Sequence, residues 1–290
     1  MRGKLWLAAT LMVAFGLVDS ARAGSFSFST GNPDGKIGTL SRPGSAGKLE
    51  TETADDFVLT NATRIDSATF TGLLTSGATL SNVTQVEIEF YHVFPLDSGP
   101  PSGNVLTRAN SPADVEIGSA TRDSGAGSLS FTPSLLNSSF SGANTVVNGI
   151  NKQPGQFTGG EGAATGEEVL FSVTFTPGVV LPAGHYFFRP EVGLSDGDFL
   201  WLSAPKPIVA PGTPFPAGAT DLQTWIRNSD LKPDWSRIGT DITHEGPFNA
   251  AFSLEGAVVP EPGTLALIGI GALGLLGYAW RRKKLLLSVA

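Results

Sequence analysis

The sequence predicts an all-β protein built as an antiparallel two-sheet sandwich with a jelly-roll-like order of strands. Three observations support this prediction. The 290-residue chain is rich in Gly and Pro, its central part lacks long segments with helical periodicity, and short segments there alternate apolar with polar residues between turn-forming clusters. Alternating segments have one apolar face that can be buried and one polar face that is exposed to solvent, which is typical of antiparallel sheets that pack face to face.

The clearest predicted strand spans residues 169–175, where Val169, Phe171, Val173 and Phe175 alternate with polar residues. Period-two alternation places these four side chains on one buried face. The same pattern, stronger or weaker, predicts eight further strands at residues 56–59, 64–74, 85–94, 128–131, 185–192, 199–202, 222–227 and 248–254. Nine strands suffice for a sandwich, although their spatial order stays open.

Two long stretches, residues 97–126 and 204–219, show no strand pattern. The second is rich in proline, which removes ladder donors and fixes φ. We expect both to be surface loops, serving either as binding segments or as decoration.

The N-terminus has the pattern of a secretory signal peptide at residues 1–23. Two positive charges precede an apolar run at residues 5–18, and Ala21 and Ala23 form a small-x-small cleavage site. We expect the mature chain to begin at Gly24, with an uncleaved N-terminal anchor as the alternative.

The C-terminus contains three consecutive features within residues 259–290. The triplet Pro260, Glu261 and Pro262 precedes an uncharged apolar run at residues 265–280. As a helix this run is about 25 Å long, near the short limit for crossing a bilayer, so a single transmembrane helix is predicted. The positive charges that follow favour the cytoplasmic side and belong to Arg281, Arg282, Lys283 and Lys284.

This order of parts resembles the PEP-CTERM sorting signal of Gram-negative bacteria. The resemblance implies that an exosortase-like enzyme processes the chain after a transient stage in the inner membrane, and that the product reaches the cell surface or extracellular matrix. It divides the chain into a signal peptide at residues 1–23, a β-sandwich domain at residues 24–258 and a sorting tail at residues 259–290. A permanent membrane anchor that is never cut is the alternative.

The charge of the body excludes one class of partner. The two tails hold seven of the 19 basic and two of the 26 acidic residues, so the remainder has a net charge of −12. A body without a basic excess has no patch to displace counterions from nucleic acid, and no nucleic-acid partner is expected. The chain has no cysteine, which excludes disulfides and thiolate metal sites.

Acidic residues supply the weak candidates for a metal site. Asp55 with Asp56, and Asp196 with Asp198, offer oxygen ligands for Ca²⁺. Their spacing does not match a calcium-binding loop. We expect no cofactor, with Ca²⁺ as the alternative.

The sequence favours a protein that is not an enzyme. Residues 193–197 match Gly-x-Ser-x-Gly around Ser195, but the following residues predict a strand, so a β-turn is expected rather than a nucleophile elbow. The three histidines, His92, His185 and His244, are far apart in the chain. A secreted hydrolase of glycan or ester bonds is the alternative, and it requires two carboxylates or a serine–histidine pair in contact.

By resemblance to proteins with this tail, the predicted partner is exopolysaccharide or another component of a biofilm matrix. Tyr91, Trp225 and Trp235 are candidates for a platform on which sugar rings stack. The Thr-x-Thr pairs of the chain have no regular period, so no ice-matching array is expected.

Overall fold

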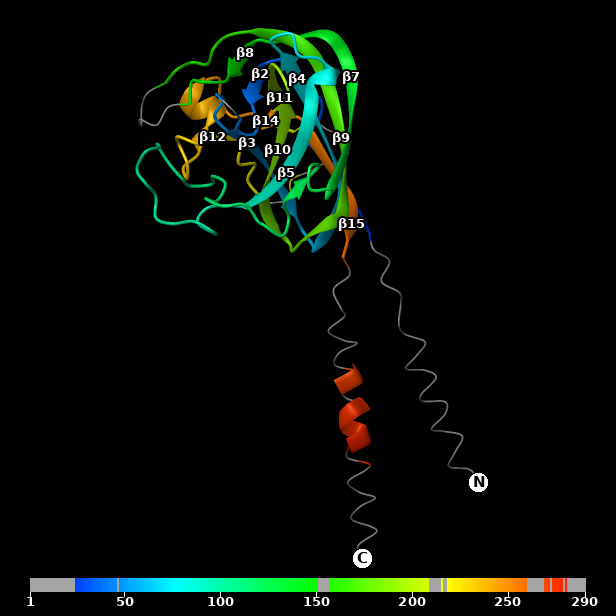
Figure 1. Ribbon diagram of the computed structural model, residues 1–290. Coiled ribbons are helices and arrows are strands. Elements are labelled where there is room, and N and C mark those ends of the chain that lie inside the picture. The colour runs from blue at the N-terminus through cyan, green and yellow to red at the C-terminus, as the bar shows by residue number, and fades with distance from the viewer. Residues whose placement is uncertain are drawn as a thin grey trace, which may run out of the picture. The chain divides into compact units, whose positions relative to one another are not determined.

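Two β-sheets pack face to face in the computed structural model (Figure 1). The structure describes residues 24–45, 47–150, 157–208, 215, 218–259, 269–271, 273–278 and 280. All named strands lie in one compact unit, Ser25–Val258.

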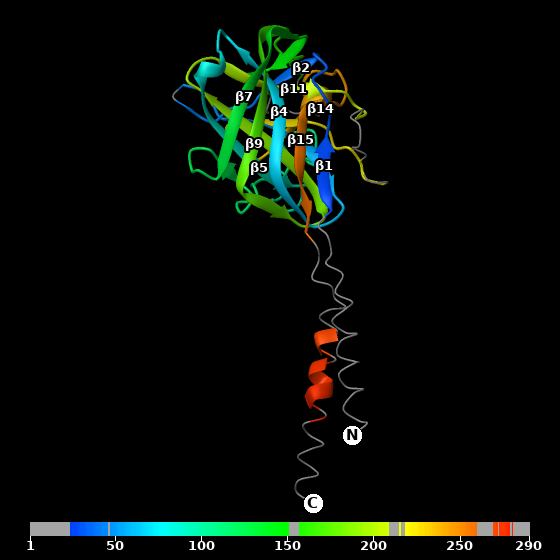
Figure 2. The same ribbon diagram turned by 90° about the vertical axis from the view of Figure 1, so that its right-hand side faces the viewer.

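The larger sheet has nine strands in the order β1-β15-β4-β11-β2-β8, with β9 paired to the other side of β4, β7 paired to β9, and β14 paired to β11. Figure 2 shows β7, β9, β4, β15 and β1 side by side, with no other segment in front of them. The bounds are β1 Ser25–Ser29, β2 Ile37–Leu40, β4 Thr63–Thr75, β7 Leu129–Gly142, β8 Asn144–Val146, β9 Ala164–Leu181, β11 Asp198–Ala204, β14 Asn249–Ala250 and β15 Phe252–Val258.

The smaller sheet has six strands in the order β13-β12-β3-β10-β5-β6. Its bounds are β3 Thr51–Leu59, β5 Val83–His92, β6 Arg122–Asp123, β10 Gly184–Leu194, β12 Trp225–Asn228 and β13 Ser236–Arg237. A 3-10 turn, Leu80–Asn82, precedes β5, and a π-helical turn, Ile238–Ile242, follows β13.

Phenylalanine side chains from both sheets form the main core. Phe70 of β4 stacks on Phe171 of β9, with ring centroids 4.9 Å apart, and Phe188 of β10 stacks on Phe252 of β15 at 5.0 Å. The second pair joins the two sheets across the sandwich. Burial of such rings is the largest apolar contribution to the stability of a core of this kind.

A second apolar cluster covers the other face of the smaller sheet. Tyr91, Trp225 and Trp235 are at most 1% exposed there, and the Trp235 indole donates to the Ala113 carbonyl in the loop after β5. The prediction that these three rings form a sugar-stacking platform is therefore wrong. The stretch at residues 97–126, which showed no strand pattern in the sequence, contributes to this covering through Ala113.

All nine predicted strands are present, and the two-sheet all-β architecture is confirmed. Two details differ from the prediction. One pair, β2 with β8, is parallel, and the predicted strand at residues 248–254 is divided between β14 and β15, which pair with different neighbours. The strands β1, β2, β6, β8 and β13 were not predicted. The last four have only two to four residues, too few to show alternation, whereas β1 alternates Ser with Phe over Ser25–Ser29 and was missed despite this pattern.

The described part of the C-terminal segment is helical at residues 269–271, 273–278 and 280. Among the described residues, no helix combines the length and apolar character that a membrane crossing requires. Residues 265–268 of the predicted span, the cleavage-site residues Ala21 and Ala23, the triplet at residues 260–262 and the basic cluster at residues 281–284 lie outside the described residues.

Candidate functional site

The first and last strands of the body are neighbours. Ser25 of β1 is paired with Ala257 of β15, and Val258 is paired with Thr63 of β4. The chain therefore enters and leaves the body at the same end of the larger sheet. Only Val259 separates the last paired residue from the triplet that begins at position 260.

The first pair of calcium candidates is buried and bonded within the protein. Asp55 accepts hydrogen bonds from the Thr224 hydroxyl at 3.1 Å and the Ala250 amide at 2.9 Å. Asp56 lies 2.6 Å from the Nε2 atom of His185 and accepts from the Leu222 amide. Burial raises the pKa of both carboxyls well above the usual value. Through these hydrogen bonds, the two side chains link β3 to the residues just before β12 and to β14.

The second pair, Asp196 and Asp198, lies at the turn between β10 and β11. Asp198 forms ion pairs with Arg42 and Lys48, whereas Asp196 is exposed and accepts from the Gly197 amide. The register places Phe188 opposite Asp55, six residues before Leu194 at the end of β10, which is about 20 Å of strand. The two pairs are therefore not brought together, and the described residues contain no group of three potential metal-ligating side chains.

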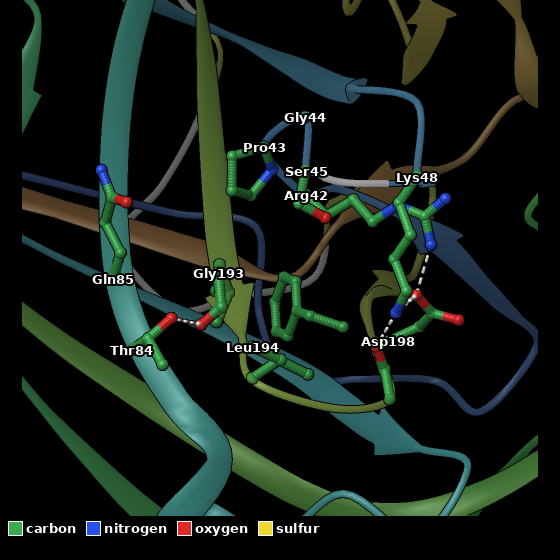
Figure 3. Close-up of a pocket in the computed structure, with 13 residues that line it drawn as sticks. Arg42, Pro43, Gly44, Ser45, Lys48, Thr84, Gln85, Gly193, Leu194 and Asp198 are labelled. Atoms are coloured by element: carbon green, nitrogen blue, oxygen red, sulfur yellow. Dashed lines mark hydrogen bonds and ion pairs between the residues drawn. The ribbon is translucent and has the colours of Figure 1, made fainter.

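A polar pocket of about 190 Å³ lies beside this turn (Figure 3). Figure 3 shows Arg42 and Lys48 directed toward Asp198 on one side and Thr84 bonded to Gly193 on the other. Asp198 balances only one of these two positive charges, so the charged residues of the lining have a net charge of +1. Its lining residues are Arg42, Pro43, Gly44, Ser45, Lys48, Thr84, Gln85, Val192, Gly193, Leu194, Gly197, Asp198 and Phe199.

Ser195 lies in the turn between two strands, as predicted for residues 193–197. The Asn82 amide donates to its hydroxyl at 3.1 Å. The three histidines have separate partners: His92 pairs with Asp97, His185 pairs with Asp56, and His244 packs against the Phe157 ring. The described residues therefore show no contact between Ser195 and a histidine.

An ionic network lies beneath the loops that cover the smaller sheet. Arg189 is 1% exposed and its guanidinium is surrounded by carboxylates, with its Nη1 atom 3.1 Å from Glu89 and its Nη2 atom paired with Glu191. Glu52 accepts from Arg227 and from Lys232, both at 2.6 Å. These two cations and Arg189 lower the pKa of Glu52 to about 2 against the opposing effect of its burial. The side chains of Glu52, Arg189 and Arg227 are at most 3% exposed, so these members of the network are buried, whereas Lys232 lies at its edge with 37% exposure.

The outer face of the larger sheet carries two rows of hydroxyl side chains on β1, β15, β4, β9 and β7. The strand register aligns one residue from each strand in each row. The first row consists of Ser29, Ser253, Thr69, Ser172 and Thr132. The second row consists of Ser27, Glu255, Ser67, Thr174 and Ser130. We refer to these ten residues as the hydroxyl face.

The hydroxyl face is open to solvent. The side chains at Ser27, Ser130, Thr132, Ser172, Thr174 and Glu255 are exposed, and the other four are half-buried. Figure 2 looks toward the five strands that carry these residues. Sequence reasoning missed this face because alternation within a strand does not show which strands become neighbours or in what register they pair. Each row combines residues from strands that are far apart in the sequence, including β1 and β15, the first and last strands of the body.

The described residues thus form a β-sandwich body, which is followed in the sequence by a C-terminal segment with helical residues. Residues 258–283 match the family described as the PEP-CTERM protein-sorting motif. The chain therefore carries a PEP-CTERM sorting motif, which implies export, processing by an exosortase-type enzyme and localisation at the cell surface. Neither the curated proteins nor the solved structures contain a match to this chain.

Proposed function

We propose that this protein is a surface or matrix protein whose sandwich body binds exopolysaccharide without cleaving it. The sorting motif supports the destination, since it implies export and localisation at the cell surface, where we expect exopolysaccharide. The hydroxyl face carries the binding part of the proposal. It is the broad exposed surface of the larger sheet, and nine of its ten side chains have hydroxyl groups.

The intact mass of the protein extracted from the cell surface tests the sorting step. We expect a mass that lacks both the signal peptide and the apolar run at residues 265–280. A mass that retains this run would contradict sorting and favour the permanent anchor. The measurement needs no knowledge of the ligand, so it tests the destination independently of the binding.

Co-sedimentation with the producing cell's own exopolysaccharide tests the binding step. We expect the mature protein to pellet with the polysaccharide while the number of reducing ends in the same tube stays constant. New reducing ends would instead identify the alternative, a hydrolase that acts on glycans. Absence of both pelleting and new ends would contradict a polysaccharide ligand.

A further inference from the structure

We propose that the hydroxyl face is the binding site for a neutral, extended polysaccharide. This inference deepens the proposed function and rests on it, because it assigns the ligand class and the surface. It differs from the sequence prediction, in which the aromatic side chains of Tyr91, Trp225 and Trp235 were the candidate contacts.

The chemistry of the face matches that of a sugar. A hydroxyl group both donates and accepts hydrogen bonds, so each Ser or Thr can pair with a sugar hydroxyl in either direction. The pair Thr69 and Ser253, whose oxygen atoms lie 2.6 Å apart on neighbouring strands, shows that the hydroxyls in one row are close enough to share a hydrogen bond. A sugar hydroxyl placed above such a pair finds a donor and an acceptor together.

The charge of the face selects a neutral ligand. Glu255 is the single ionisable side chain among the ten residues of the face. The ten residues have one negative charge and no cation, and the neighbouring Arg64 of β4 is paired with Asp66, so the face repels an acidic polysaccharide. The body as a whole is also acidic, so longer-range attraction does not compensate.

The dimensions of the face suit an extended chain. Five strands at the usual spacing give a row about 19 Å long, and the two rows lie about 7 Å apart because they are two residues apart along each strand. A polysaccharide that follows a row across the strands meets a new hydroxyl about every 5 Å. Many weak contacts along one chain then add up, because binding of one sugar unit raises the effective concentration of the next.

A triple variant tests the site: Thr132→Val, Ser172→Ala and Thr174→Val. These three residues are exposed and adjacent on β7 and β9. Valine retains the shape and strand preference of threonine, so the fold should not change. The control variant carries Thr60→Val, Ser119→Ala and Ser138→Ala, which remove three exposed hydroxyls outside the face. Both variants are made in the producing cell and extracted from its surface in mature form.

The probe is the cell's exopolysaccharide, separated by anion exchange into a neutral and an acidic fraction. For the neutral fraction we expect the face variant to raise the Kd at least about tenfold, from the loss of three hydrogen-bonding groups. The control variant should stay within about twofold of the unmodified protein. Equal thermal midpoints of the three proteins establish that the fold is intact.

The outcomes separate this inference from the proposed function. Unmodified protein that binds neither fraction contradicts the proposed function. Binding that the face variant retains at full strength overturns the site assignment and leaves the proposed function in place. Tighter binding to the acidic fraction overturns the neutral ligand class. Thermal hysteresis of ice growth that disappears in the face variant, without polysaccharide binding, overturns the proposal in favour of ice.

Discussion

At the scale of single residues, the buried network of the smaller sheet has more carboxylates than cations. Arg189, Arg227 and Lys232 lie among five glutamates, so two carboxylates lack a balancing charge if all are ionised. Burial is the main cause that raises the pKa of Glu191 to about 8 and of Glu87 to about 7. The remaining members are Glu50, Glu52 and Glu89.

This imbalance predicts that the free energy of unfolding falls as the pH rises from 6.5 to 8. The Glu191 pKa is about 8 in the folded protein and 4.5 in its unperturbed state, so the folded state binds more protons across this window. Linkage then gives a loss of about 1–2 kcal/mol for this group. Burial lowers the pKa of His185 to about 4. This side chain therefore destabilises the folded state only as the pH falls below about 6.5, outside the window considered.

Urea unfolding at pH 6.5 and pH 8 checks the prediction, with Glu191→Gln as the matched variant. Glutamine resembles the protonated carboxyl and has no proton to lose, so the decline with pH should be smaller in this variant. An equal decline in both proteins would show that Glu191 is ionised in the folded state throughout the window.

At the scale of elements, the contact between β4 and β11 depends on a glycine. The side chain of Phe199 lies over Gly72, and a Cβ atom added there would be 2.0 Å from the ring. We expect Gly72→Ala to lower the free energy of unfolding by about 2–3 kcal/mol, since the buried ring must move. Gly118→Ala is the control, because no atom lies within 4 Å of its added Cβ. Equal urea midpoints for the two variants would contradict this account.

The elements also show which parts of the structure a single sequence predicts. Alternation is a local property, so β4, β5, β9 and β10 could be predicted from their own residues. The sorting tail could be predicted for the same reason, because its parts are consecutive. The burial of Trp235 could not be predicted, since its indole contacts Ala113 in a loop 122 residues earlier in the chain.

The hydroxyl face is the clearest example of this limit. The alternation in β9 predicts a polar face with Ser172 and Thr174, but not its neighbours. Its rows depend on the register that places Ser67 beside Glu255 on one side and beside Thr174 on the other. No periodicity along the chain contains this information, because hydroxyls from five strands meet only after the sheet has formed.

At the scale of the whole molecule, the position of the two ends of the body explains how a sorted protein can lose its tail and keep its fold. Every strand among the described residues lies within Ser25–Val258, and β15 is paired with β1 on one side and β4 on the other. Phe252 and Leu254 of β15 lie in the main core. Cleavage after Val259 removes none of these contacts.

We therefore expect the mature, surface-extracted protein and the full chain in detergent to unfold at midpoints within about 3 °C of each other. A difference below about 1 kcal/mol corresponds to such a shift for a body of this size. A chain that ends at residue 251 is the contrasting variant. It lacks β15, loses two buried core side chains and leaves β1 without its paired strand, so it should not fold cooperatively. A mature form that melts far below the full chain would show that the tail contributes to the stability of the body, and a cooperative transition in the shortened chain would contradict the central position of β15.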